Sequence, residues 1–135
     1  MNELIVFPSA VAATITALNS QLASLGFTGV QAYGSVPKPR PARFVRVFRV
    51  GGQRDGLVVD DALLAVESGA GYDKDAEDLA MAARAIVYAM QGTVIGDTSV
   101  YLVTESAGPA NLPDPESAQS RFTFTVEIAC RGYAA

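Results

Sequence analysis

The chain has no histidine, no tryptophan and a single cysteine, Cys130, among its 135 residues. Without histidine, neither a Ser-His-Asp nor a Cys-His catalytic arrangement can form. One thiol and some carboxylates are a poor ligand set for zinc, so we expect no metal and no cofactor. A lone cysteine also excludes an intrachain disulfide, which suits a reducing compartment. These absences predict a protein that is not an enzyme.

Charge is also scarce, because no charged residue lies between Leu4 and Pro37. This run does not predict a membrane span, since Pro8 and many hydroxyl and amide side chains interrupt it. The N-terminus lacks the positive region of a signal peptide. The net charge of -4 argues against a general nucleic-acid binder.

The remaining motifs give no catalytic pattern. Gly51-Gly52 is followed by a predicted turn and strand, whereas a phosphate loop leads into a helix. Asp60 and Asp61 are expected on opposite faces of a strand, so they cannot easily share a site. Asp73 or Asp75 is expected to cap a helix. A glycosidase-like carboxylate pair is therefore not predicted.

Two segments, residues 9–25 and 73–91, have the apolar spacing of helices. The buried stripe expected for the first helix consists of Val11, Ile15, Leu18, Leu22 and Leu25, before a stop at Gly26. The other face of this helix carries no charge. It is covered either by its own domain or by a neighbouring subunit, and the sequence leaves both open.

Period-two alternation predicts five strands, over residues 30–36, 43–50, 57–67, 100–107 and 120–130. The second and third strands form a hairpin with a polar tip at 51–56. Cys130 falls on the apolar face of the last strand and is expected to be a buried filler. We predict one α+β domain over 1–135, in the order α-β-β-β-α-β-β, with a mainly antiparallel sheet and both helices on one face.

Six of the ten basic residues fall within residues 38–54, around three alternating prolines that make a stiff connector. In the following strand Arg43 and Arg49 share one face, while Arg46 shares the other with the phenylalanines. Nucleic-acid binding would favour aromatic and basic side chains together. We favour contacts between these arginines and carboxylates of another subunit, because guanidinium groups pair well with carboxylates.

Two stretches carry a family resemblance. They are VPKPRPARFVRV at residues 36–47, and GPANLPDP at 108–115 followed by RFTFTV at 121–126. Together with the helix between them, they resemble the tail terminator proteins of long, non-contractile-tailed phages (siphoviruses), especially those that infect actinobacteria. The resemblance covers nearly the whole chain, and its motifs are structural rather than catalytic.

This resemblance implies an α+β virion structural protein that forms a hexameric ring at the neck, the head–tail junction. The ring caps the head-proximal end of the tail tube, ends tube polymerisation and joins the tail to the head-completion, or stopper, protein. DNA passes through its centre without specific binding. The protein would be found in the virion, and in the host cytoplasm during assembly.

The interface residues are our own prediction and come from the 43–49 strand, the 51–56 tip and the 108–119 loop. They are Arg43, Arg46, Arg49, Arg54, Asn111, Pro113, Asp114 and Arg121. Two alternatives remain open: another ring component of the same apparatus, such as a tail tube subunit or a stopper, and a small ligand-binding or regulatory α+β module.

Overall fold

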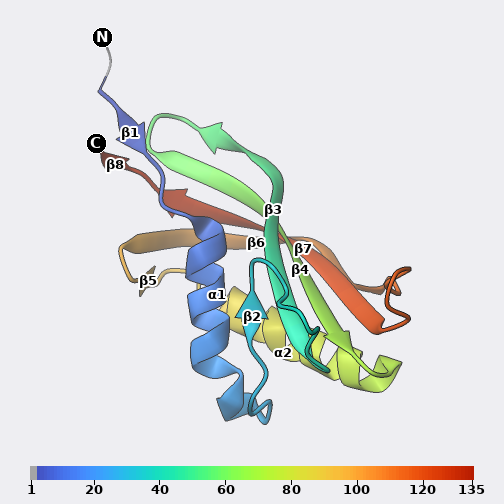
Figure 1. The fold of residues 1–135 in the computed structure, drawn as a ribbon. Helices are drawn as coiled ribbons and strands as arrows, with labels where there is room; N and C mark the ends of the chain where they lie inside the picture. The colour runs from blue at the N-terminus through green and yellow to red at the C-terminus, as the bar shows by residue number, and fades with distance from the viewer. Residues whose placement is uncertain (1–2) are drawn as a thin grey trace.

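A six-stranded sheet with two helices on one of its faces makes up most of the computed structural model, which describes residues 3–135 (Figure 1). The strand order is β2-β3-β4-β7-β6-β5. All neighbours are antiparallel except β2 and β3. The strands are β2 (Ala32–Tyr33), β3 (Phe44–Asp55), β4 (Val59–Ala70), β5 (Val94–Ile95), β6 (Thr98–Asn111) and β7 (Ser120–Arg131).

The two helices are α1 (Ala10–Gln21) and α2 (Asp73–Tyr88), and a 3-10 turn, η1 (Ala23–Leu25), follows α1. Side chains from both helices join one core with the inward residues of β3, β4, β6 and β7. The α+β class and the placement of both helices on one face are therefore confirmed. No helix in the described part of the chain is long and apolar enough to cross a membrane.

Strand β7 shows the predicted alternation. Its inward residues, from Phe122 to Cys130, are buried against the helices. Cys130 is fully buried, and loss of water around its thiol raises the pKa to about 11. The prediction that Cys130 is a core filler is confirmed.

Helix α1 begins where expected, and four of the five residues of the predicted stripe join the core. Leu18 and Leu22 are buried, and Val11 and Ile15 are half-buried and pack against the core. The Ser9 hydroxyl caps it by accepting a hydrogen bond from the Ala12 amide at 3.0 Å. Thr14 is fully buried and donates its hydroxyl proton to the Ala10 carbonyl at 2.8 Å. Leu25, predicted in the buried stripe, is 49% exposed. The 3-10 turn winds more tightly than an α-helix, so the 3.6-residue period fails there.

The β3–β4 hairpin is longer than predicted, and its tip lies at residues 56–58 rather than 51–56. Gly51-Gly52 marks a β-bulge within β3 and not the turn. Gly52 has φ +106, and a Cβ atom there would collide with the Asp61 carbonyl oxygen. A double glycine fits either a turn or a bulge, which is why the sequence misplaced the tip.

Three other boundaries differ from the prediction. Tyr72 is the N-cap of α2 and gives no side-chain cap, so neither Asp73 nor Asp75 caps the helix; both lie in its first turn, where they suit the helix dipole. Of the strand predicted at 30–36, only β2 (Ala32–Tyr33) is present in the structure. Strand β6 extends to Asn111 because register shifts accommodate Gly108 and Pro109, so the long loop covers only 112–119.

The chain ends form a second, two-stranded sheet that the sequence analysis missed. β1 (Ile5–Val6) pairs with β8 (Tyr133–Ala134) beside the hairpin tip. The amide of Gly132 donates to the Val58 carbonyl at 2.7 Å, which ties this sheet to the hairpin. Figure 1 shows that β1, β8 and the end of the β3–β4 hairpin project together past α1. We call this projection the arm.

Candidate protein-interaction surface

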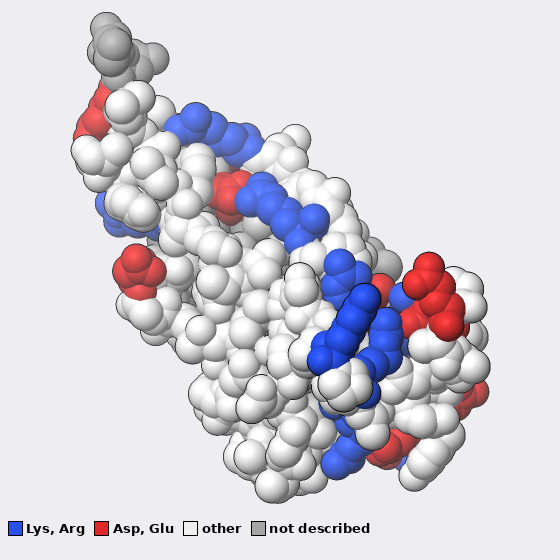
Figure 2. Space-filling model, viewed as in Figure 1, with Lys and Arg blue, Asp and Glu red and all other residues white. Residues whose placement is uncertain are grey.

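Basic side chains form a line along β3 and the connector before it, visible in blue in Figure 2. We call this line the arginine ribbon; its members are Arg40, Arg43, Arg46, Arg49 and Arg54. Four of them form ion pairs with carboxylates of the same chain. In each pair the arginine is more exposed than its carboxylate, so the ribbon presents guanidinium groups outward over acidic groups beneath.

The tightest of these pairs joins Arg49 to Asp60 on β4. The guanidinium donates two hydrogen bonds to the carboxylate, at 2.7 and 2.8 Å, and its Nε donates to the Gly51 carbonyl at 2.8 Å. The hydrogen bond to Asp60 raises the pKa of Arg49. Asp60 is only 5% exposed and lies opposite Cys130 in the β4–β7 ladder. Arg49 therefore neutralises a carboxylate at the edge of the core.

Asp61, the next residue on β4, points to the other side of the sheet. Its ladder partner is Ala129, whereas that of Asp60 is Cys130. Partial burial, followed by the nearby charge of Asp55, raises the pKa of Asp61. The two neighbouring carboxylates therefore lie on opposite faces, as predicted, and do not form a shared site.

A second charged cluster covers one end of the outer face of the sheet, the face turned away from the helices. Glu67 lies between Arg46 and Arg121, with N–O distances of 3.5 and 3.3 Å. The guanidinium of Arg46 also stacks on the Phe48 ring, 4.2 Å from its centre. This stacking explains how a charged and an aromatic residue can share one face of β3.

The proline connector and the 112–119 loop are held together next to this cluster. Arg40 pairs with Asp114 at 3.1 Å, and the Gln119 amide donates to the Ala42 carbonyl at 3.0 Å. Hydrogen bonds from the Glu116 amide and the Ser117 hydroxyl, aided by Arg40, lower the pKa of Asp114. We call the connector (residues 34–43) and the loop (112–119) together the latch.

The predicted interface residues thus fall into separate groups. Arg46, Asp114 and Arg121 come together at the latch, while Arg49 and Arg54 lie farther along the hairpin. Arg43 and Asn111 face the first turn of α2, through contacts with Asp75 at 3.7 Å and Asp73 at 3.4 Å. Pro113 is exposed in the loop. Their role in contacts between subunits stays a prediction.

The ion pairs within the chain decide which charged side chains remain available to a binding partner. Within residues 3–135, the basic residues outside any ion pair are Lys38, Arg54 and Arg131. The corresponding carboxylates are Glu3, Asp55, Asp61, Asp73, Glu77, Asp97, Glu116 and Glu127. Most uncommitted charge is therefore acidic, although the sequence shows a basic cluster. No group of three or more metal-ligating side chains is found in the described chain.

An uncharged groove, missed at the sequence level, lies between α1, α2 and β5. It measures about 560 Å³, and none of its lining side chains is charged. Ala17 and Ser20 line it from α1, Ile86 from α2, and Val94 from β5. We call it the helix groove. Its sequence signals were two uncharged stretches, from Leu4 to Pro37 and from Ala85 to Gly96.

The structure also bears on how α1 is covered. Its outward residues, including Thr16, Asn19 and Ser20, are exposed, so its own chain leaves this face open within residues 3–135. Most of the other residues of the helix are buried or half-buried, so its own domain covers the helix except for this face. Packing against a neighbouring subunit stays a prediction.

Comparison with known proteins finds a shared fold but no match in sequence. The chain matches no protein-family profile. No curated protein sequence matches it either. A solved structure described as the virion of a native gene transfer agent (GTA) particle contains a chain of the same fold, with a TM-score of 0.61. The match covers 93% of this chain and 100% of that chain at 18% sequence identity.

Proposed function

We propose that this protein is a structural component of a phage virion. The observation that carries the proposal is the likeness to a virion chain, which extends over nearly the whole length of both proteins. The resemblance of the 36–47 and 108–126 segments to phage proteins agrees with it. A structural role also suits a chain without histidine and with its one thiol buried in the core.

Within the virion we propose the more specific role of a tail terminator. Six copies would form a ring that caps the head-proximal end of the tail tube and ends its growth. The ring would then bind the head-completion protein, and DNA would pass through without specific contacts. Support comes from the resemblance and from the latch, since prolines that pre-order two segments reduce the entropy lost when a partner binds them.

The test is a tube-length assay. Purified protein is added to polymerising tail tube subunits, and tube lengths are measured by electron microscopy. A terminator shortens the tubes in proportion to its concentration and is found at one end only. An unrelated protein of the same size serves as the control and leaves the lengths unchanged.

Other outcomes identify the alternatives. If tube lengths do not change and this protein itself grows into tubes, it is a tube subunit and the terminator role is wrong. If this protein binds components on the head side of the junction but never a tube end, a stopper role is favoured. A strict monomer that binds a small ligand saturably would instead indicate a ligand-binding module.

A further inference from the structure

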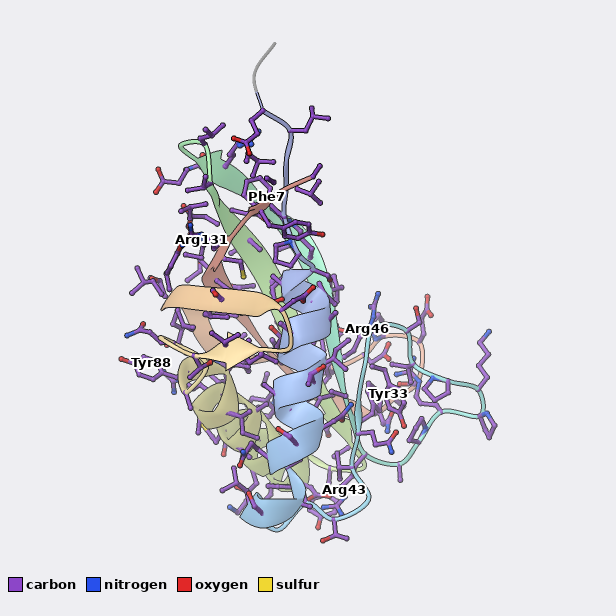
Figure 3. All side chains as sticks on the ribbon, turned by 90° about the vertical axis from the view of Figure 1, so that its left-hand side faces the viewer. Phe7, Tyr33, Arg43, Arg46, Tyr88 and Arg131 are labelled. Carbon is purple, nitrogen blue, oxygen red and sulfur yellow. The ribbon has the colours of Figure 1, made fainter. Side chains whose placement is uncertain are left out.

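The latch places an acidic loop over a cluster of arginines. Between them lies a hollow of about 290 Å³, lined on one side by Arg40, Arg46 and Arg121. The 112–119 loop supplies Asp114 and Glu116 to the other side. Figure 3 shows Arg46 where the connector and the loop come together beside α1. We call the three arginines the latch arginines.

The latch arginines keep most of their hydrogen-bonding capacity. Within residues 3–135 each of the three guanidinium groups donates a single hydrogen bond, although a guanidinium group carries several N–H donors. Arg40 and Arg46 lie over the rings of Phe44 and Phe48, 5.2 and 4.2 Å from the ring centres. Stacking uses the flat face of the guanidinium group and leaves the N–H groups at its edge available for a carboxylate.

The loop makes the hollow electrically balanced. Three carboxylates line it together with the three guanidinium groups, but two of these carboxylates, those of Asp114 and Glu116, belong to the loop. The third belongs to Glu67, which is 9% exposed at the floor of the hollow. If the loop lifted, three guanidinium groups would face one carboxylate. The site would then be cationic and would attract an acidic group.

The closed position of the loop has several unfavourable features. Ala118 has φ 57, a left-handed conformation that residues with a Cβ atom seldom adopt. The side-chain oxygen of Gln119 is buried and has no hydrogen-bond partner in the described part of the chain. Six of the eight loop residues are exposed, so few buried contacts hold the loop down. A segment of this kind opens at a lower free energy than the core does.

We propose that the loop is an internal stand-in for an acidic segment of a partner protein. The partner's segment would displace the loop and pair its carboxylates with the latch arginines. The loop sequence LPDPES, at residues 112–117, shows the chemistry that fits: carboxylates on a chain that prolines keep extended. The inference deepens the proposed function by giving the chemistry of one partner contact, and it rests on that function only for the partner's being a virion protein.

Two other occupants fit less well. A second copy of this chain would first have to lift its own loop to release Asp114, so two loops would open for one contact. A nucleic-acid duplex is too wide for a hollow of about 290 Å³ and would bring only single phosphates to its rim. A free acidic segment of another protein needs one loop to open and can enter the hollow.

The test uses a variant whose loop has lost its carboxylates. Asp114→Asn with Glu116→Gln keeps the length and the prolines of the loop, and we call it the opened variant. The matched control is Glu77→Gln with Asp97→Asn, which changes the net charge equally at two exposed residues outside any ion pair within residues 3–135. The probe is a fluorescein-labelled LPDPES peptide, whose binding is measured by fluorescence anisotropy at low salt. Circular dichroism checks the fold of each variant.

The opened variant should bind the acidic peptide at least about tenfold more tightly than the wild type and the control do, because its own loop no longer competes for the arginines. Adding Arg40→Gln should remove most of this gain, since Arg40 is exposed and pairs with Asp114 in the closed loop. A neutral peptide, LPNPQS, should show no gain with any variant.

Three outcomes overturn the proposal: an opened variant that binds the acidic peptide no better than the control, an equal gain for the neutral peptide, or a larger gain for a short DNA duplex, which would indicate a phosphate site. If the opened variant co-sediments with the wild type, the occupant is a second copy and the choice of partner is wrong. The tube-length assay is independent of these results. Shortened tubes without peptide binding refute the latch contact alone, and peptide binding without an effect on tube length refutes the terminator role alone.

Discussion

Replacing Arg49 with alanine would leave the Asp60 carboxylate at the edge of the core without its partner. Asp60 is 5% exposed, and the guanidinium supplies two hydrogen bonds to it, at 2.7 and 2.8 Å. Water can enter from the exposed side of Arg49 but should replace those bonds only in part, because Asp60 itself is buried. The variant should therefore lose stability in the monomer, whatever happens to its assembly.

The size of the effect follows from the burial of the two partners. Removing one partner of a buried ion pair costs about 3–5 kcal/mol. The side chain of Arg49 is 41% exposed, against 8% for that of Asp60, so water reaches one side of the pair. We therefore expect a loss of about 2–3 kcal/mol in the free energy of unfolding. With an unfolding entropy of about 2.1 cal/mol/K per residue, this lowers the melting temperature by about 7–11 °C.

The assay is a double-mutant cycle followed by circular dichroism in heat and in urea. Asp60→Asn in the Arg49→Ala background removes the unpaired charge and should recover part of the lost stability. Arg49→Lys should fall between alanine and wild type, because an ammonium group cannot donate in the bidentate geometry. If Arg49→Ala melts within 2 °C of wild type but assembles less well, Arg49 acts between subunits and the reasoning is wrong.

Three further changes test other parts of the structure. Gly52→Ala places a Cβ against the Asp61 carbonyl at φ +106 and should cost about 2–4 kcal/mol in urea unfolding, whereas Gly71→Ala, with open space around it, should cost less than about 1 kcal/mol. Asp114→Asn should speed amide exchange of residues 112–119 at pH 7. Hydrogen bonds lower the pKa of Asp114 in the folded protein, so its stabilising effect is present above its ordinary pKa of 3.8 and is lost below the folded pKa. In acid, the exchange rates of the wild type and the Asp114→Asn variant should therefore converge. Cys130 should react with a thiol reagent only in denaturant, because burial raises its pKa to about 11; rapid reaction of the native protein would contradict its place in the core.

Much of the fold follows from local patterns that the sequence displays directly. The alternation from Phe122 to Cys130 predicted β7 within one residue, because an antiparallel strand with one covered face imposes period two. The helices were located by their apolar spacing in the same way. Gly51-Gly52 was misread because its meaning depends on the Asp61 backbone across the hairpin, which no local pattern contains.

The candidate surface was less predictable because its charges are paired over long distances in the chain. Arg40 and Asp114 are separated by 74 positions, and Arg49 and Asp60 come together only because the hairpin continues past the bulge. The arm was missed for a similar reason. Its two-residue strands are too short to show alternation, and they pair the opposite ends of the chain.

This long-range pairing decides between two ways in which copies of the chain could associate. The sequence suggested that ribbon arginines bind carboxylates of a neighbour, but four of the five already bind carboxylates of their own chain. A partner would have to displace these pairs, and exposed ion pairs give only about 0–1 kcal/mol each in return. The helix groove faces no such competition, because none of its lining side chains is charged. If apolar contacts drive association, added salt should leave assembly of the wild type nearly unchanged, whereas association through the arginines should weaken steeply as salt screens them.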